Sequence, residues 1–514
     1  MKVLFIFPNI DCGGYKPVGL TTVMTSSQQA GHEIRLFDTS FIEPYDFTSE
    51  SDYRGGSAAG EEILNFAPVN LNGYNLHKEH TSVSEALTEQ LRDFAPDVIG
   101  ISALSLEWPL CIHLMKTVKE YDPSILTVLG GVHAYADPEG SIAEESLDIL
   151  CIGEGEEAFP ELLQNIAAGG DYQDTAGFWI KRNGRTFKNS IGQVVDNLDE
   201  LPYMNYDLYD DRLMYRIYDG KVYRSADYTL TRGCPYKCTY CLYEKMNSTG
   251  EGNTKLRSYS VDRAVAELKY LKDRYNLDFI RFQDATFLNI SEKYLKELAT
   301  RYAAEIGLPF VIDASPQTVT KEKARALAEM GCVSVSVGVE TGNEKMRFEV
   351  CKKPVKNEVI HRAFEYLNGY SLRTVSFLLM GFPLETEEMY WDSVNLVRKA
   401  RVNAPNLGFV YPFKGSQLSE TAIEMGLFNP DSEDAVSYDR LVPAISNPNI
   451  SDAKYRGLLR TFPLFVKFPE KYWDEIKKAI NYDADGQEVY NKFKKIYQNE
   501  NLYTGFLPEQ YSIS

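Results

Sequence analysis

Three cysteines, Cys234, Cys238 and Cys241, lie within eight consecutive residues of this 514-residue sequence. Thiolates are the side chains that bind iron–sulfur clusters, and gaps of three and two residues allow one loop to wrap around a single cluster. Three protein ligands leave one iron of a four-iron cluster open, and an open iron can chelate amino and carboxylate groups. The alternatives are a zinc site and an incidental grouping of cysteines. Zinc ordinarily takes four ligands, and no fourth cysteine or histidine lies nearby in the sequence.

The remaining cysteines are scattered along the chain at Cys12, Cys111, Cys151, Cys332 and Cys351. Eight cysteines in a chain of this length do not form the dense pattern of a disulfide framework. We therefore expect reduced thiols, several of them buried as small apolar residues. Cys12, Cys111 and Cys151 leave open a second cluster in the first part of the chain, which an enzyme that transfers methylthio groups would need.

The cysteine loop follows the first strand of a second α/β segment. Apolar runs that predict strands alternate there with amphipathic helical segments, such as residues 261–271 and 291–306. Six βα units are too few for a closed eight-stranded barrel, but they suit a partial one. From residue 425 onward the sequence is largely polar and helical in pattern. The strands are expected at residues 228–231, 279–282, 310–312, 334–339, 375–380 and 408–411.

The cysteine motif resembles that of the radical S-adenosylmethionine superfamily. Cys234, Cys238, Tyr240 and Cys241 match the family's C-x3-C-x-aromatic-C pattern, and the resemblance extends over residues 225–415. It implies a [4Fe-4S] cluster whose open iron binds S-adenosylmethionine. It also implies that an electron, from a donor such as flavodoxin or ferredoxin, splits this molecule into methionine and a 5′-deoxyadenosyl radical.

Further stretches of the same segment are similar to the S-adenosylmethionine contacts of that family. The family's Asp-Asp-x-Phe stretch resembles QDATF at residues 283–287, although Gln replaces the first Asp and one residue is added. Its Gly-x-Glu-Ser-Gly stretch resembles GVETG at residues 338–342. The alternative for each acidic residue is a solvated carboxylate at a strand end. The resemblance implies S-adenosylmethionine contacts from Tyr240, Asp284, Ser315 and Glu340.

The first 170 residues alternate strands with helices, a pattern that predicts parallel pairing with right-handed crossovers. We expect a doubly wound α/β sheet of about five strands, whose ligand edge is formed by the loops after the carboxyl ends of the strands. Residues 40–80 interrupt the pattern, because they are polar and lack clear periodicity. The strands are expected at residues 3–7, 34–37, 98–101, 125–129 and 149–152.

Small residues follow two neighbouring strands of this expected sheet. Ser102-Ala103-Leu104 follows the third strand, and Gly130-Gly131 follows the fourth. A hydroxyl can hydrogen-bond a buried aromatic base, and paired glycines allow a wide group to approach the backbone. Alternatively, the glycines only end a strand and Ser102 caps the next turn.

These strand ends resemble the cobalamin-binding domain of corrinoid enzymes. GGVH at residues 130–133 and GEGE at residues 153–156 are similar to a pair of stretches in cobalamin-dependent radical S-adenosylmethionine enzymes. No histidine lies in the Asp-x-His-x-x-Gly motif that ligates cobalt from below, so the resemblance implies cobalamin with a displaced base and no histidine ligand. Cobalamin contacts are implied for Ser102, Leu104, Gly130, Gly131, His133, Gly153, Glu154 and Gly155.

These features divide the chain into four parts. Residues 1–170 are expected to form a cobalamin-binding α/β domain, and residues 171–224 a hairpin, with its turn at Asn183-Gly184, followed by a linker. Residues 225–424 are expected to form a partial (β/α)6 radical S-adenosylmethionine barrel, and residues 425–514 a helical C-terminal region.

The net charge of −19 argues against a protein that tracks nucleic-acid phosphates with clustered lysine and arginine. The short basic pair Lys352-Lys353 is expected on a solvated helix face. The apolar run at the start of the sequence is too short for a signal peptide, and no window approaches eighteen consecutive apolar residues. We therefore expect no membrane span and a cytoplasmic location.

Together the resemblances imply a cobalamin-dependent radical S-adenosylmethionine enzyme, and specifically a methyltransferase that acts on an unactivated carbon of a small molecule, lipid or peptide. No residue is identified as a catalytic acid or base. One alternative is radical oxidation, cyclisation or rearrangement without methyl transfer. Another is a non-catalytic sensor of cobalamin or S-adenosylmethionine. The three intact cysteines argue against a sensor, because a sensor has no use for an open iron.

Overall fold

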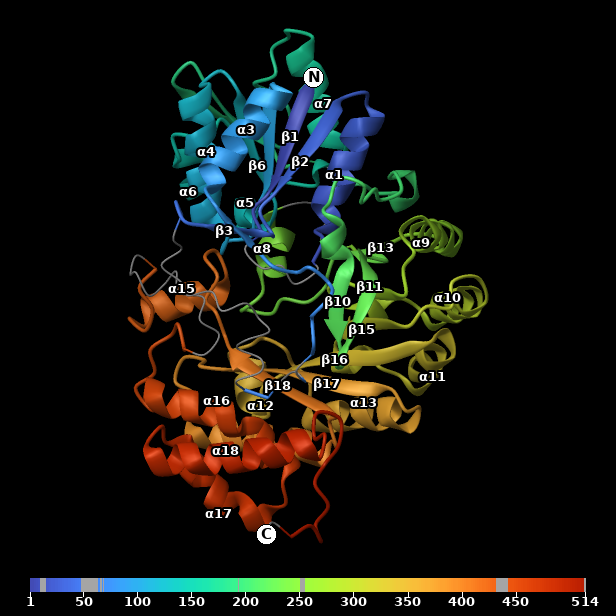
Figure 1. Cartoon of the computed structure of the whole chain (residues 1–514), viewed down its shortest axis with the longest axis vertical. Helices are drawn as coiled ribbons and strands as arrows, with labels where there is room; N and C mark the ends of the chain where they lie inside the picture. Colours follow the sequence, from blue (N-terminus) through green and yellow to red (C-terminus); the bar gives the residue numbers. More distant parts are fainter. Residues whose placement is uncertain are drawn as a thin grey trace.

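The structure is a computed structural model that describes residues 1–9, 15–47, 63, 64, 67, 69–192, 194–249, 255–430 and 442–512. Two α/β units lie one above the other along the long axis, and helices from the end of the chain pack below the second unit (Figure 1). Helix α8 (Leu242–Thr249) lies between the two units. The two termini lie at opposite ends of the molecule.

The first unit is built on a seven-stranded sheet in the order β2 (Glu33–Asp38), β1 (Lys2–Phe7), β5 (Val98–Ser102), β6 (Leu126–Gly130), β7 (Ile149–Cys151), β8 (Phe178–Arg182) and β9 (Arg185–Lys188). The five neighbouring strands β2, β1, β5, β6 and β7 are parallel, which confirms the expected doubly wound sheet. The chain leaves β1 for β2 on one side and continues at β5 on the other. The topological switch point, where such sheets bind ligands, therefore lies between β1 and β5.

Two segments that were expected to lie outside this sheet contain short strands. In the 40–80 segment, β3 (Ile42–Pro44) and β4 (Glu79–Thr81) form a short parallel pair, while most residues between them lie outside the described part of the chain. Strands β8 and β9 form the expected hairpin, whose turn has positive φ at Asn183 and Gly184. This hairpin pairs with β7 and so extends the first sheet.

Helices cover both faces of the first sheet. α1 (Val18–Gln29) and α7 (Gly155–Ala167) pack together on one face, and α3 (Val83–Phe94) and α4 (Trp108–Tyr121) pack together on the other. Successive side chains of a strand enter opposite layers, as Phe5 and Leu4 of β1 do. Because both faces are buried, the strands are nearly continuous apolar runs in the sequence.

The second unit is a partial (β/α)6 barrel, as expected, preceded by one antiparallel strand. Helices α9 (Val261–Tyr275), α10 (Glu292–Glu305), α11 (Lys321–Met330), α13 (Asn357–Gly369) and α14 (Glu387–Lys399) follow its strands, and Figure 1 shows α9, α10, α11 and α13 on the outer side of the curved sheet. Its strands follow the order β10 (Tyr215–Tyr218), β11 (Lys221–Tyr228), β14 (Phe279–Phe282), β15 (Phe310–Ala314), β16 (Cys332–Glu340), β17 (Arg373–Met380) and β18 (Ala404–Phe409).

Two barrel strands differ from the sequence-based expectation. The first was expected at residues 228–231, but β11 ends at Tyr228, and the next residues form β12 (Thr231–Arg232), which pairs with β13 (Arg257–Ser258) outside the barrel. The Asp284 carboxylate accepts the Thr231 N–H over 2.6 Å and thereby draws the chain away from the sheet. The last strand was expected at residues 408–411 but ends at Phe409, because the proline at position 412 cannot donate to a ladder.

The C-terminal region is helical, as expected, and packs against the last part of the barrel. α16 (Asp452–Lys467) lies against α14 and β18, and α17 (Trp473–Ile476) and α18 (Ala484–Asn499) complete the layer. Trp391 of α14 packs between Phe465 and Trp473, with ring centroids 4.8 and 5.6 Å away. Among the helices that the structure describes, none has both the length and the apolar character needed to cross a membrane.

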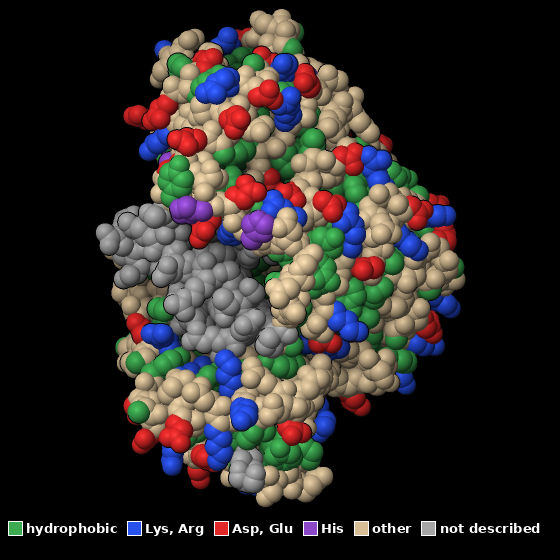
Figure 2. Space-filling model, viewed as in Figure 1, with side chains coloured by type: hydrophobic (Ala, Val, Ile, Leu, Met, Phe, Trp, Pro, Cys, Tyr) green, Lys and Arg blue, Asp and Glu red, His purple; other side chains and the backbone are tan. Residues whose placement is uncertain are grey.

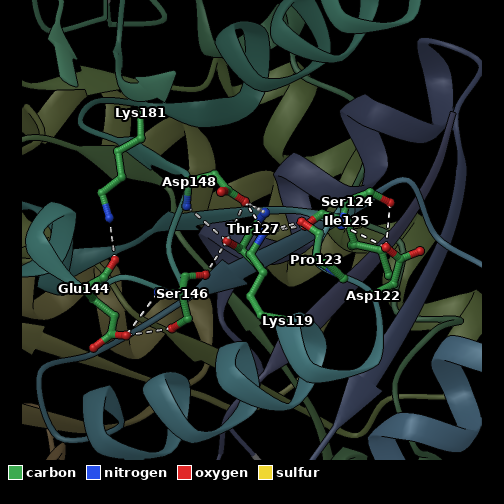
Figure 3. Close-up of polar contacts among 10 residues, drawn as sticks. All are labelled: Lys119, Asp122, Pro123, Ser124, Ile125, Thr127, Glu144, Ser146, Asp148 and Lys181. Carbon is green, nitrogen blue, oxygen red and sulfur yellow. Dashed lines mark hydrogen bonds and ion pairs between the residues drawn. The ribbon is translucent and has the colours of Figure 1, made fainter. Parts of the chain in front are cut away.

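A polar network closes the first sheet at the edge opposite its ligand edge (Figure 3). Asp148, which directly precedes β7, accepts hydrogen bonds from Thr127 N of β6 over 2.8 Å and from Lys119 Nζ of α4 over 2.5 Å. The Thr127 hydroxyl donates to Ser146 O over 2.7 Å. The single Asp148 carboxylate therefore ties two strands and a helix together.

Replacing Asp148 with Ala should lower the free energy of unfolding by about 1–3 kcal/mol, because a buried N–H and an ammonium lose their acceptor. Urea denaturation would measure the change. Glu145→Ala is the matched control, since Glu145 is exposed nearby and should change stability by less than about 0.5 kcal/mol. An equal loss in both variants would contradict the structural role of Asp148.

Candidate active site between the two α/β units

The three predicted cluster ligands lie on the loop that joins β12 to α8. Cys234 is buried, Cys238 and Cys241 are partly buried, and Cys241 N donates to Cys238 O over 3.1 Å. Burial raises the pKa of each thiol, to about 11 for Cys241, so each thiol stays protonated until a metal binds. Across the residues that can be described, no three Cys, His, Asp or Glu side chains converge as they would on a single metal ion. In a four-iron cluster every cysteine binds a different iron, so three cysteine ligands need not converge on one point.

The cysteine loop is held in place by distant parts of the barrel. Thr239 donates from its backbone N to Cys351 O over 3.2 Å and from its hydroxyl to Val350 O over 2.7 Å. Leu418 N donates to Thr239 O over 2.9 Å, and Asn247 Nδ2 donates to Cys234 O over 2.7 Å. The loop is therefore preorganised by the protein itself.

Glu340, a predicted S-adenosylmethionine contact, ends β16 with φ of +68°, a conformation that is strained for a residue with a side chain. Its Oε1 accepts a hydrogen bond from Lys353 Nζ over 2.8 Å, and Lys353 also donates to Gly338 O over 2.8 Å. The expectation of a solvated face was wrong for Lys353, which is buried. Its ammonium offsets part of the effect of burial on the pKa of Cys234 and Cys238.

Asp284, the second acidic residue predicted to contact S-adenosylmethionine, lies two residues after the end of β14 and is 2% exposed. Its Oδ1 accepts hydrogen bonds from the Thr231 N–H and hydroxyl, both over 2.6 Å, and Oδ2 accepts from Leu230 N over 3.2 Å. Burial raises its pKa to about 6, although these hydrogen bonds oppose the rise. Both oxygens thus support the chain that leads to the cysteines, and the contact with S-adenosylmethionine stays a prediction.

The other two predicted contacts lie at the same edge of the barrel. Ser315 follows β15 and donates from its hydroxyl to Gln317 Oε1 over 2.7 Å. Tyr240 packs against Phe382, which follows β17, with ring centroids 6.4 Å apart. Since the carboxyl ends of parallel strands meet at one edge, Tyr240, Ser315, Asp284 and Glu340 gather around the barrel mouth. Their individual contacts remain predictions.

A cavity of about 390 Å³ lies between the two units and is lined by both. On the barrel side it reaches Thr231, Arg232 and Gly233, directly before the first cluster cysteine. On the side of the first unit it extends below the strand ends, between the sheet and α1, where Phe5 and Val23 line it. The lining combines apolar side chains with glycines and charged groups. Six residues predicted to contact cobalamin line it: Ser102, Gly130, Gly131, Gly153, Glu154 and Gly155.

Glycines keep this cavity open. At Gly130 an added Cβ would touch only Cys151 Cβ at 3.6 Å and Ile101 O at 4.0 Å, so it would occupy cavity space. Gly131 has φ of +89°, and a Cβ there would lie 2.8 Å from Ala103 N and O. The two glycines and the Ser102 hydroxyl form the cradle that the cobalamin prediction requires, so the residues present fit that group.

The two remaining predicted contacts lie beside the cavity but are absent from its lining. His133 is buried, with Nδ1 3.1 Å from Ser105 Oγ and its ring 4.6 Å from that of Trp108. Its Nε2 has no hydrogen-bond partner in the described part of the chain, and burial lowers its pKa to about 4. Leu104 is 38% exposed, and its N–H donates to Glu107 Oε2 over 2.9 Å.

The two glutamates of the GEGE stretch line the cavity and also bind arginines of the second unit. Glu154 accepts hydrogen bonds from both terminal nitrogens of Arg257, over 2.7 and 2.9 Å, and Glu156 accepts from Arg232 over 2.6 Å. Burial alone would raise the pKa of Glu154, but these guanidinium groups outweigh it and hold that pKa below its ordinary value. Arg232 and Arg257 were not predicted site residues, and Glu156 was part of the predicted GEGE stretch without a role of its own.

Two further contacts hold the units together. Lys16, which lies two residues before α1, is fully buried, and its N–H donates to Asp227 Oδ2 of β11 over 3.0 Å. Its Nζ donates to two backbone carbonyls of the second unit. On the other side of the barrel, a Cβ at Gly415 would lie 2.4 Å from Ala136 O, so the backbones are in close contact. Both ends of the partial barrel are thus joined to the first unit.

The cysteines considered for a second cluster are not arranged to share one. Cys111 belongs to the core layer that contains α3 and α4, whereas Cys151 belongs to the layer that contains α1 and α7, on the opposite face of the sheet. Cys12 lies outside the described residues. The geometry therefore gives no support to methylthio transfer.

The described surface carries charges of both signs. Figure 2 shows acidic and basic side chains interspersed over the described part of one face of the molecule. Nucleic-acid binding along this face would require a continuous basic stripe, and the described residues of this view do not form one.

Comparison with known proteins shows what the two units are similar to. A family model described as B12 binding domain matches residues 66–163, and one described as Radical SAM superfamily matches residues 228–397. The chain is 26% identical over 339 residues to an uncharacterised methyltransferase of Pyrococcus horikoshii, covering 66% of this chain and 72% of that protein. It is 24% identical over 457 residues to cytidylyl-2-hydroxyethylphosphonate methyltransferase of Streptomyces wedmorensis, covering 81% and 79%.

A solved structure extends the likeness over both units. The radical S-adenosylmethionine methyltransferase TsrM of Kitasatospora setae, with cobalamin and a [4Fe-4S] cluster bound, matches with a TM-score of 0.65 at 15% identity. The match covers 96% of this chain and 99% of that chain. At this identity the likeness establishes a common fold.

Gly131→Ala should lower the free energy of unfolding by about 1–3 kcal/mol, because the new Cβ meets backbone atoms in a strained conformation. Gly130→Ala should leave stability nearly unchanged and instead reduce the corrinoid retained per chain after desalting, because its methyl group enters the cavity. Urea denaturation and the visible corrinoid spectrum measure the two effects. Wild-type corrinoid content in a folded Gly130→Ala variant would contradict the assignment of the cavity.

Proposed function

Because this chain belongs to the cobalamin-dependent radical S-adenosylmethionine enzymes, we propose that it is a methyltransferase that acts on an unactivated carbon of a polar small molecule. One observation carries the proposal. A single cavity joins the edge of the first sheet at Ser102 and Gly130 to Gly233, the residue before Cys234. The two predicted cofactor positions therefore adjoin one cavity.

The barrel and the first sheet would each hold one of the bound groups, and each group supplies a different part of the chemistry. When bound, the cluster with S-adenosylmethionine supplies a 5′-deoxyadenosyl radical, and cobalamin supplies a methyl group. Cys234, Cys238 and Cys241 would hold the cluster, and the glycine cradle would hold cobalamin. The protein contributes position and partial shielding from water, since both units line the space between the edges.

The inner face of the barrel is the proposed place of the substrate. The strand register puts Asp227, Arg281 and Asp313 on this face, where Arg281 pairs with Asp313 at 2.6 Å and Arg216 pairs with Asp227 at 3.0 Å. Phe377 of β17 faces the same space and is 38% exposed although it lies on a central strand. Ion pairs on one wall and an aromatic ring on the other favour a substrate that has both polar groups and an apolar part.

The relative from Streptomyces wedmorensis supports this substrate class, because its named substrate is a nucleotide-linked phosphonate. An electron donor such as flavodoxin or ferredoxin belongs to the same proposal, since reductive cleavage consumes an electron. A lipid is less compatible with the partly exposed ion pair of Arg281 and Asp313.

Metal analysis and product analysis test the proposal. Protein purified and reconstituted without oxygen should contain about four iron atoms and one cobalt per chain, as one cubane and one corrinoid require. Labelled methyl from S-adenosylmethionine should appear in the product. 5′-Deoxyadenosine without labelled product would favour oxidation, cyclisation or rearrangement. Iron near eight per chain without corrinoid would favour methylthio transfer, and absence of 5′-deoxyadenosine under strong reductant would favour a sensor.

Cys238→Ala should abolish the iron–sulfur absorbance and reduce 5′-deoxyadenosine formation to background, because one iron loses its protein ligand. Corrinoid content should stay at the wild-type level, since the cradle lies in the other unit. Cys332→Ala is the matched control, because Cys332 begins β16 at the opposite end of the barrel. Full activity in Cys238→Ala would contradict the cluster assignment.

The cobalt of the loaded protein should have no histidine ligand. His133 lies beside the cavity but is absent from its lining, and no histidine of the sequence lies in the Asp-x-His-x-x-Gly motif. The electron paramagnetic resonance spectrum of Co(II) should therefore lack splitting from an axial histidine nitrogen. Such splitting, if lost in His133→Phe, would overturn this expectation.

A further inference from the structure

Two arginines face each other across a short antiparallel ladder beside the cysteine loop. Arg232 of β12 is the direct partner of Arg257 of β13. Like charges in directly opposite positions of a ladder destabilise it unless other groups neutralise them. The pair therefore needs two carboxylates.

Both carboxylates come from the other unit. Glu154 and Glu156 lie at the start of α7, directly after β7 of the first sheet. Glu154 accepts both terminal nitrogens of Arg257, and Glu156 accepts Arg232 over 2.6 Å. Arg232 also lies 3.6 Å from Glu154, so the four side chains form one connected, neutral network.

The network is shielded from solvent. The exposed fractions are 3% for Arg257, 4% for Glu156, 15% for Arg232 and 16% for Glu154. Buried pairs are screened by salt much less than surface pairs, and loss of one partner leaves an uncompensated charge. Val195 completes the network, because its N–H donates to Glu154 Oε2 over 2.8 Å and its carbonyl accepts from Arg257.

This arrangement accounts for the carboxylate oxygens of Glu154. Oε1 accepts from Arg257, and Oε2 accepts from Arg257 and Val195. Three of the roughly four acceptor sites of this carboxylate are used within the protein, so it serves as a support in the cavity wall. The resemblance alone had implied a direct contact with cobalamin.

We propose that four residues are positioning residues: Glu154, Glu156, Arg232 and Arg257. They fix the position of the cysteine loop relative to the ligand edge of the first sheet. Arg232 lies two residues before Cys234, and all four side chains line the cavity between the two edges. The loop after β7 thus sets where the cysteine loop stands. The identity of the two cofactors rests on the proposed function, but the mechanical link does not.

Hydrogen exchange tests the link with or without bound cofactors. In Glu156→Gln, which keeps the shape and removes the charge, amide exchange in peptides covering residues 229–243 should rise about tenfold, as expected for the loss of about 1.4 kcal/mol of local stability. Glu157→Gln is the matched control, since Glu157 is the next residue of α7 and is exposed. Unchanged exchange at residues 229–243 in a folded Glu156→Gln variant would overturn the proposal.

A double variant controls for misfolding in Glu156→Gln, where the Arg232 guanidinium loses its carboxylate partner. Glu156→Gln combined with Arg232→Gln removes both charges, and it should show the same rise in exchange while the rest of the barrel keeps wild-type protection. Wild-type exchange throughout this double variant would also overturn the proposal, because no link would then depend on the pair.

Magnetic interaction between the cofactors gives a second readout in the loaded protein. In reduced protein, the relaxation of the Co(II) signal by the cluster should be uniform in the wild type and in Glu157→Gln, but weaker or heterogeneous in Glu156→Gln. An identical interaction in Glu156→Gln with full iron and cobalt content would contradict positioning. A wild type without corrinoid would instead contradict the proposed function, and the exchange comparison would still decide the link.

Discussion

Charges buried between the two α/β units must be paired, because an isolated charge in a water-poor interface is strongly destabilising. Lys16 meets Asp227 there, and the arginines of the β12–β13 ladder meet the glutamates that open α7. These pairs hold the carboxyl ends of both sheets toward each other. The cavity that joins the two predicted cofactor positions exists because the units meet in this orientation.

The same requirement explains why acidic residues at strand ends serve as supports. Glu154 accepts hydrogen bonds from Arg257 and Val195, and Asp284 accepts them from Leu230 and Thr231. A buried carboxylate is stable only when N–H or O–H groups surround it, so these two side chains organise the chain near them. The predicted cofactor positions themselves consist of glycines and cysteines, whose side chains need few or no hydrogen-bond partners.

Much of the fold could be predicted from the sequence, because its signals are local. The parallel strands are buried on both faces and stand out as apolar runs, and the Asn183-Gly184 turn specifies its own hairpin. Two local expectations failed for a common reason. The strand expected up to residue 231 ends early because a carboxylate more than fifty residues later, that of Asp284, binds Thr231. Lys353 is buried because it pairs with Glu340, thirteen residues earlier on β16.

By itself, the sequence determined which residues can bind a cluster and which strand ends can admit a wide cofactor. Three features are properties of short stretches and can be recognised without knowledge of the fold. They are the spacing of the cysteines, the paired glycines and the period of the hydrophobic residues. Only the tertiary structure decided that the two edges share one cavity and which charges hold them together. The pairs Glu156 with Arg232 and Glu154 with Arg257 span 76 and 103 residues of chain, and no local pattern encodes contacts between groups so far apart.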